Sequence, residues 1–357
     1  MQRRFLYMIV LTLVAVLVVV VMSPRDQSSG VPVADDLWLP ELAANINDVN
    51  RVEIVSAGNQ TVATLVKSDN GWLLEESGGY RANWGKLRGL LGDLAQARVL
   101  ETKTDKPAYY ARLGVEDISA ANAGGVLVKI SFDQQTTRVL VGHAAEGRTG
   151  RYVRLQDAAG SALVDRQLDV SSVQLDWIDS TIVDINAVQV AEVEVIHPTA
   201  ERLLVTRVSA DQTDFDLVGL PQGREIKSSW SVNSLASIFS MLNMETVRPA
   251  DNVDWDDAVK LRVLLFSGME IMADTVVNGD EYLFRLRASH PAAAVVSEDT
   301  AATDEQRDIN KRAAEDVRQA VENINQKVVG WAFGITQQKY DAIVRKPEDL
   351  LKPMESE

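Results

Sequence analysis

The chain has 357 residues, of which 46% are hydrophobic and 24% are charged, and its formal net charge is −15. This composition is typical of a folded globular protein, and the length favours two domains because a single core seldom grows beyond about 250 residues. An acidic surface repels phosphate groups, so nucleic-acid binding is excluded as an expected function. The sequence contains no cysteine, which excludes disulfide bonds and thiol chemistry.

A long apolar segment lies at the N-terminus. It begins at Phe5, ends at Met22 and contains no charged residue. A helix of this length extends about 27 Å, close to the roughly 30 Å hydrocarbon core of a bilayer. Arg3 and Arg4 precede the segment, so the positive-inside rule places the N-terminus in the cytoplasm and the bulk of the chain in the periplasm. We therefore expect a single-pass protein of a bacterial inner membrane.

A cleaved secretory signal would have the same charged start and apolar middle. Signal cleavage requires small residues at the end of the apolar segment, whereas this segment ends in Val21 and Met22, followed by Ser23 and Pro24. We favour an uncleaved anchor, and both interpretations export the rest of the chain. Residues 23–36 are polar and contain Pro and Gly, so we expect them to form a tether.

From residue 37 onward, the pattern predicts short strands and one helix. Val52 and Ile54 alternate with polar neighbours, as in a half-buried strand, and Asn70-Gly71 indicates a hairpin turn. Further strands are expected over residues 61–67, 72–75, 126–132, 138–141 and 152–155. Between them, a helix is predicted by the single stripe formed by Leu87, Leu90, Leu91 and Leu94.

The same order of elements recurs in the second half of the chain. Val193 and Val195 repeat the alternation of the first strand, and Asn278-Gly279 indicates another hairpin turn. Strands are expected over residues 202–208 and 214–218 and at Leu261, Val263 and Leu265, with a second helix stripe formed by Leu235, Ile238, Phe239 and Leu242. The recurrence predicts an internal duplication, an α+β fold of two units with mainly antiparallel strands and one packed helix each.

The C-terminal part is expected to close the fold. Residues 289–303 form a predicted loop, and the charged helix expected from Asp304 to Lys327 has a narrow, alanine-rich stripe that predicts shallow packing. A last helix is expected over residues 337–345. The predicted division is a cytoplasmic stub and anchor (1–22), a tether (23–36), a first repeat (37–186), a second repeat (187–288) and a closing segment (289–357).

Several short motifs occur in an order that resembles the domain-of-unknown-function family 4340. They are Gly71-Trp72, Tyr80, the sequences YARLG (110–114), VG (141–142) and GRYVR (150–154), Trp177-Ile178-Asp179, Leu220-Pro221, Trp331, Tyr340 and EDLL (348–351). The resemblance covers residues 37–351. It implies a membrane-tethered exported protein of a kind often encoded beside gliding-motility-type ABC-transporter genes, with permease subunits as expected partners and no catalytic residues to carry over. The chain departs from the family pattern where residues 289–327 add length.

Motifs of known chemistry are sparse in the sequence. His143, His197 and His290 are not spaced as metal ligands, so we expect structural or surface roles for them. The nucleophile elbow GxSxG, the phosphate-binding loop GxxxxGK[ST] and the dinucleotide motif GxGxxG are all missing from the sequence. We therefore assign no catalytic, cofactor-binding or metal-binding residue.

One acidic cluster surrounds a tryptophan. Asp251, Asp254, Asp256 and Asp257 lie around Trp255, which suggests either a cation site, a sugar-stacking site or a solvated loop. The loop is favoured because the spacing of a calcium-binding loop is missing. Of the other tryptophans, core packing is expected for Trp72, Trp84, Trp177 and Trp331, and weaker candidates for contact surfaces are Trp38 and Trp230.

The expected function is a non-catalytic extracytoplasmic accessory subunit, for binding or scaffolding, of an ABC-transporter-like membrane complex. Tethering at the membrane raises the effective concentration near such a partner. Two alternatives stay open at this level. An envelope polysaccharide or peptidoglycan hydrolase would require a cleft with two facing acids. A tethered receptor would require a pocket for a soluble ligand.

Overall fold

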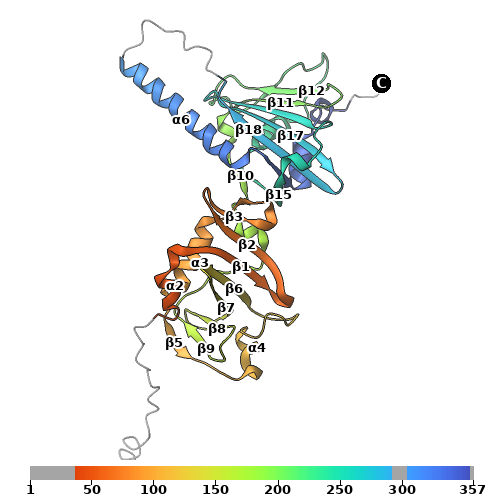
Figure 1. Cartoon of the computed structure of the whole chain (residues 1–357). Coiled ribbons are helices and arrows are strands. Elements are labelled where there is room, and N and C mark those ends of the chain that lie inside the picture. Colours follow the sequence, from red (N-terminus) through yellow and green to blue (C-terminus); the bar gives the residue numbers. More distant parts are fainter. Residues whose placement is uncertain (1–36, 292–303, 354–357) are drawn as a thin grey trace, which may run out of the picture.

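The computed structural model describes residues 37–291 and 304–353, which form two α+β units arranged one above the other (Figure 1). Each unit is organised around an antiparallel sheet. The predicted membrane anchor (5–22) and tether (23–36) lie outside the described residues. Among the helices of the described ranges, we find none that is both long and apolar enough to cross a bilayer.

The first unit contains a nine-stranded sheet in the order β4-β3-β2-β1-β6-β7-β8-β9-β5. Its strands are β1 (Val49–Ser56), β2 (Gln60–Ser68), β3 (Gly71–Leu74), β4 (Tyr80–Arg81), β5 (Val99–Thr102), β6 (Val126–Phe132), β7 (Gln135–Ala144), β8 (Arg151–Leu155) and β9 (Ser161–Val164). Its helices are α2 (Pro40–Ala44), α3 (Trp84–Gln96) and α4 (Tyr110–Leu113). The predicted hairpin at Asn70-Gly71 and the leucine stripe of α3 are confirmed, since β2 pairs with β3 and the four leucines are buried.

The second unit contains an eight-stranded sheet in the order β13-β12-β11-β16-β17-β18-β19-β15. Its strands are β11 (Val190–Ile196), β12 (Arg202–Thr206), β13 (Asp216–Leu217), β15 (Thr246–Pro249), β16 (Val259–Leu265), β17 (Glu270–Asn278), β18 (Glu281–Ser289) and β19 (Trp331–Ile335). Its helices are α5 (Ser229–Asn233), α6 (Asp304–Val328), α7 (Gln337–Ile343) and α8 (Pro347–Leu350). A separate two-stranded sheet pairs β10 (Thr181–Val183) with β14 (Leu242–Asn243).

The two large sheets have the same strand order. When β1–β3 are matched to β11–β13 and β5–β9 to β15–β19, the order β3-β2-β1-β6-β7-β8-β9-β5 reproduces the whole second sheet. The sheets also share an irregularity, because the register shifts between Val49 and Arg51 opposite β6 and between Val190 and Glu192 opposite β16. The shared order and register make Val52 and Leu65 of the first sheet the counterparts of Val193 and Val205 of the second.

The predicted second helix is wrong over most of its length. The α-helix α5 ends at Asn233, a 3₁₀ turn follows, and Leu242 lies in β14. The four residues of the predicted stripe are nevertheless buried, at Leu235, Ile238, Phe239 and Leu242. Six serines lie from residue 228 to residue 240. The hydroxyls of Ser231 and Ser234 each donate to the backbone carbonyl three residues earlier, at 2.7 and 2.9 Å. Such local bonds compete with the helix ladder, which explains the early end of the helix.

The second sheet does not stop at the expected boundary of residue 288. Strand β19 pairs with both β18 and β15, so the sheet needs residues 331–335. The first unit joins β8 to β9 through residues 156–160, whereas the second unit carries α6 in the corresponding connection. Residues 181–183, expected in the first repeat, pair through β10 with β14 of the second half. The helix α6 is therefore an insertion within the second unit.

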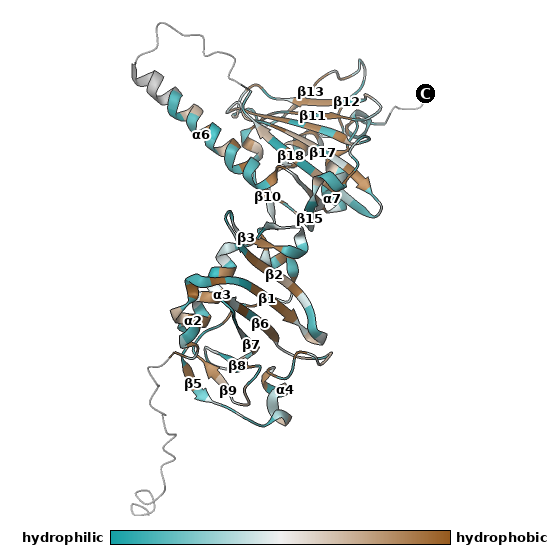
Figure 2. Ribbon diagram, viewed as in Figure 1, coloured by the Kyte–Doolittle hydropathy of each residue, from teal (hydrophilic) through white to brown (hydrophobic). Residues whose placement is uncertain are grey.

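Among residues 311–328 of helix α6, the side chains that pack on the core begin at Val317. Val317, Ala320, Val321 and Ile324 contact the core, and the Asn325 amide bonds to both the amide and the carbonyl of Ala288 at 2.8 Å each. Residues 311–316 are exposed on every side of the helix. The helix extends away from the second sheet and is largely hydrophilic along its length (Figures 1 and 2). The predicted helix and its shallow packing are confirmed.

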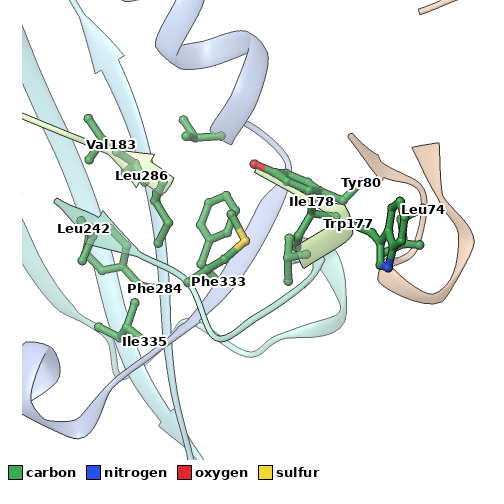
Figure 3. Packing of buried hydrophobic residues seen from close by; sticks show 14 of the residues in the cluster. Leu74, Tyr80, Trp177, Ile178, Val183, Leu242, Phe284, Leu286, Phe333 and Ile335 are labelled. Atoms are coloured by element: carbon green, nitrogen blue, oxygen red, sulfur yellow. The ribbon is translucent and has the colours of Figure 1, made fainter. Parts of the chain in front are cut away.

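The two units share one continuous core. Tyr80 of β4 is fully buried, and its ring meets Trp331 at 5.0 Å and Phe333 at 6.0 Å, both edge to face. Figure 3 shows Leu74 and Trp177 of the first unit in line with Phe333 and Phe284 of the second. Gly78 has a φ of +68°, and a Cβ there would lie 2.9 Å from Pro249 Cδ. The junction is therefore packed like an interior.

Candidate functional site

The three histidines lie far apart in the described structure. His143 is exposed beside Gly114 and Gly124, and His290 lies beside Gly268. His197 is buried, with its Nε2 atom 3.2 Å from the carbonyl of Arg345. Within residues 37–291 and 304–353, no three His, Cys, Asp or Glu side chains gather closely enough to hold a metal ion. His197, the residue after β11, thus takes part in a hydrogen bond to the segment after α7.

The acidic residues around Trp255 form an exposed loop. Asp251, Asp254, Asp256 and Asp257 are all exposed, and the Asp254 carboxylate accepts a bond from the amide of Asp256 at 3.0 Å. The Trp255 ring is already covered by the guanidinium of Arg285, which lies 4.4 Å from the ring centre. That tryptophan face is therefore occupied by the protein itself, which argues against the sugar-stacking interpretation of this loop.

The prediction that Trp84 packs in the core is wrong. Its side chain is 49% exposed, whereas Trp177 is fully buried as predicted. Trp84 is the first residue of α3, and Asn83 caps this helix by accepting a bond from the amide of Lys86 at 3.1 Å. The cap places Trp84 beyond the covered part of the leucine stripe. Its indole instead stacks on Trp72, with ring centres 6.4 Å apart and planes 11° from parallel.

The two stacked indoles line a pocket of about 630 Å³ in the first unit. The pocket lies between the turn before β1, the β2–β3 hairpin, β4 and the first half of α3. Its lining residues are Ile46, Asn47, Val49, Lys67, Asn70, Gly71, Trp72, Arg81, Ala82, Trp84, Arg88 and Leu91. The volume is in the range of about 300–1,000 Å³ that is usual for small-molecule sites.

The pocket lining is cationic. Three of its residues, Lys67, Arg81 and Arg88, carry positive charge, and none is acidic. The Lys67 ammonium donates to the carbonyl of Asn47 at 2.9 Å. Arg81 and Arg88 are exposed, and neither guanidinium forms a hydrogen bond or ion pair with any residue of the described ranges. Two guanidinium groups are thus available to a ligand in a chain whose net charge is −15.

The pocket lies at the edge of the sheet, where residues from different strands reach it. Lys67 pairs with Trp72, so these two side chains share one face. Arg81 pairs with Leu73 and belongs to the opposite face, and it borders the pocket from the edge strand β4. The sequence interpretation missed these cations because they lie on separate elements and are interspersed with Asp69, Glu75 and Glu76.

The second unit has counterparts of two pocket residues. Val52 pairs with Leu65, and its counterpart Val193 pairs with Val205, so Leu65 and Val205 are counterparts. Arg207, two residues after Val205, therefore corresponds to Lys67, two residues after Leu65. Leu74 pairs with Leu65 and Leu217 pairs with Val205, so Leu74 and Leu217 are counterparts. Two residues earlier in each strand, Phe215 therefore corresponds to Trp72. The position of each counterpart thus follows from strand pairing alone.

In the second unit, the chain itself occupies the counterpart region. The Arg207 guanidinium, which is 8% exposed, donates to the carbonyls of Ala187, Val188, Val190 and Gln212. It also lies 4.7 Å from the ring centre of Phe215 and 5.3 Å from that of Phe266. Burial lowers the pKa of Arg207 from its usual value because the charged form loses hydration.

A family model, Domain of unknown function (DUF4340), matches residues 72–262, which is more than half of the chain. The chain belongs to this family. The matched range covers six pocket residues in the first unit and continues into β16 of the second unit; the six are Trp72, Arg81, Ala82, Trp84, Arg88 and Leu91. No curated protein and no solved structure matches the chain.

Several motifs that carry the DUF4340 resemblance have structural roles. A Cβ on Gly142 would lie 2.1 Å from the carbonyl of Leu113, so the VG motif allows close packing of the YARLG segment. Arg154 of the GRYVR motif is buried and donates to the carbonyls of Val115 and Ala158 at 2.8 and 2.9 Å. Tyr80 and Trp331 meet at the junction. These residues maintain the fold rather than form a site.

Proposed function

We propose that this DUF4340 protein is a non-catalytic extracytoplasmic accessory subunit of an ABC-transporter-like complex, anchored in the inner membrane by residues 5–22. The uncharged N-terminal segment supports the location, because its length fits a bilayer. We also propose that the two units arose by duplication, since their sheets share strand order and register. The transporter as partner follows from the family resemblance.

The observation that carries the proposal is the helix α6. It has 25 residues, which corresponds to a length of about 37 Å, and its C-terminal half packs on the second unit while residues 311–316 are exposed. Its stripe continues into the exposed half at Ala313. Amphipathic helices commonly bind partners by laying such a face into a groove. The exposed part of α6 at residues 311–316 is therefore the surface that we assign to the membrane partner.

The absence of cysteine from the sequence allows a site-specific test. A single cysteine at Arg312→Cys on α6 would carry a photoreactive maleimide, and Asn278→Cys at the exposed end of β17 would be the matched control. In cells that express the permease, we expect a crosslink to that membrane protein from position 312 and at most a trace from position 278. Equal crosslinking from both positions, or none from position 312, would contradict the proposal.

The location requires a separate measurement. A membrane-impermeant maleimide added to spheroplasts should label Arg312→Cys in the full chain without lysis. Labelling only after lysis would place α6 in the cytoplasm and overturn the proposed topology.

A further inference from the structure

We infer that the pocket between Trp72, Trp84 and the two free guanidinium groups binds a short anionic glycan, of the kind made from uronic acid units. This site is independent of the transporter partner, because the pocket lies in the first unit and α6 belongs to the second.

The indoles supply the surface for the sugar rings. The face of a pyranose ring carries C–H bonds with a partial positive charge, and the face of an indole ring is electron-rich, so the two surfaces attract each other. The nearly parallel rings of Trp72 and Trp84 present neighbouring faces in one orientation. Trp84 is half exposed, and no cation covers its face among the described residues, unlike the face of Trp255.

The arginines supply the charge recognition. A guanidinium binds a carboxylate through two parallel hydrogen bonds, which is a strong and geometrically specific interaction. Arg81 and Arg88 line the same pocket and have no ion-pair partner among the described residues. The rest of this acidic chain repels anions, so a ligand carboxylate is stabilised only where such cations gather.

Polar side chains at the rim suit the hydroxyl groups of a glycan. Asn47 and Asn70 each offer an amide that donates and accepts hydrogen bonds, and both line the pocket. An extended acidic peptide is the less suitable ligand, because it would bind by adding a strand at the β4 edge. The amides of Ala82 and Asn83 there already donate to the carbonyls of Trp72 and Trp177.

Comparison with the second unit predicts one site per chain. There the counterpart of Lys67 is Arg207, whose guanidinium is buried against Phe215 and donates to four carbonyls. In the second unit, the contact between an aromatic ring and a guanidinium is therefore made entirely within the chain. In the first unit, Trp72 and the arginines remain open to a ligand.

The test is calorimetric titration of the full chain, solubilised in a detergent without a sugar headgroup, with trigalacturonate. The matched neutral ligand is its trimethyl ester, which keeps the ring shape and removes the charge, and triglutamate tests the peptide alternative. The variants are Trp84→Ala and the double variant Arg81→Gln/Arg88→Gln. The matched controls outside the pocket are Trp230→Ala and Arg287→Gln, since Trp230 is 75% exposed and Arg287 is exposed.

We expect trigalacturonate to bind at a single site with a submillimolar Kd at about 50 mM NaCl, and more weakly at about 500 mM, where charges are screened. The ester, Trp84→Ala and the double arginine variant should each weaken binding at least about tenfold, and the controls should change it less than about twofold. Thermal unfolding verifies that each variant is folded. If Trp84→Ala does not fold, the binding measured for the double arginine variant tests the inference. No binding, equal binding of the ester, tighter binding of triglutamate, or insensitivity to the pocket variants would overturn the inference.

Discussion

The two units share a strand order but differ in the hydrogen bonds made by one basic residue, which is Lys67 in the first unit and Arg207 in the second. In the first unit, Lys67 makes one bond to the carbonyl of Asn47 and borders an open pocket. In the second, Arg207 donates to four carbonyls and lies against two aromatic rings. The same position of the fold is therefore either satisfied by internal hydrogen bonds or left at the border of an open pocket. The difference between Lys and Arg matters here because only a guanidinium offers enough donors for all four carbonyls.

The largest expected effect is at the junction that holds the two units together. Tyr80→Ala removes a fully buried ring that contacts Trp331 and Phe333, and such truncations cost about 4 kcal/mol of unfolding free energy. We expect the single urea transition of the full chain to separate into two, one for each unit.

Tyr80→Phe is the matched control for this junction. The Tyr80 hydroxyl is buried and has no hydrogen-bond partner among the described residues, and burial raises its pKa. Removing it should leave stability unchanged or increase it by up to about 1 kcal/mol. A loss from Tyr80→Phe equal to that from Tyr80→Ala would show that the hydroxyl, and not the ring, joins the units.

The second effect tests the asymmetry between Arg207 and Lys67 directly. Arg207→Ala leaves one buried and three partly buried carbonyls without this donor and removes the contact with Phe215, so we expect a loss of about 3 kcal/mol. Lys67→Ala removes one exposed bond and should cost less than about 1 kcal/mol. Urea unfolding measures both values, and similar losses at the two positions would mean that the counterpart residues have the same role.

The smallest effect concerns pH and the pair formed by Glu53 and Lys129. Burial raises the pKa of Glu53, but hydrogen bonds from Lys129 and Arg51 outweigh burial, and its pKa lies below the usual value. A carboxylate with a lowered pKa stabilises the fold above its unfolded-state pKa of about 4.3 and loses that contribution as pH falls through the folded-state pKa.

Lys129→Gln should therefore reduce stability at pH 7 by about 0.5 kcal/mol, because the pair is about one-third exposed, and the difference should vanish once Glu53 is protonated at low pH. Urea unfolding at pH 7 and in the acid range measures this change. The control is Lys106→Gln, since Lys106 is exposed. A difference for Lys129→Gln that persisted after protonation of Glu53 would assign the effect to packing of the lysine stem.

Alternation in the sequence predicted most of the half-buried strands, because one face of each is buried and the other is polar. Strand β9 escaped prediction since all four of its residues are buried, which leaves no period of two in the sequence. The stripe of α3 was predicted correctly, whereas the serines after residue 228 shortened the second helix. The sequence pattern therefore identified the elements that bury only one face and whose side chains do not compete for the backbone hydrogen bonds.

The pocket could not be predicted because it depends on tertiary placement. Trp84 falls on the leucine stripe by spacing, and only its position at the first turn of α3, beside Trp72, leaves it exposed. Arg81 and Arg88 become neighbours through pairing of β4 with β3 and through the start of α3. In the sequence, the three basic pocket residues are interspersed with acidic residues, and only the fold brings them to a pocket whose lining has no acidic side chain.

The insertion of α6 has a mechanical consequence. The helix ends at Val328 and β19 begins at Trp331, the residue whose ring rests on Tyr80 of the first unit. Lys327, in the last turn of the helix, forms an ion pair with Asp179 at 2.6 Å, and both border a cavity that Trp84 also lines. Rotation of the exposed part of α6 would thus be transmitted to the junction between the units, because only two residues connect the helix to Trp331.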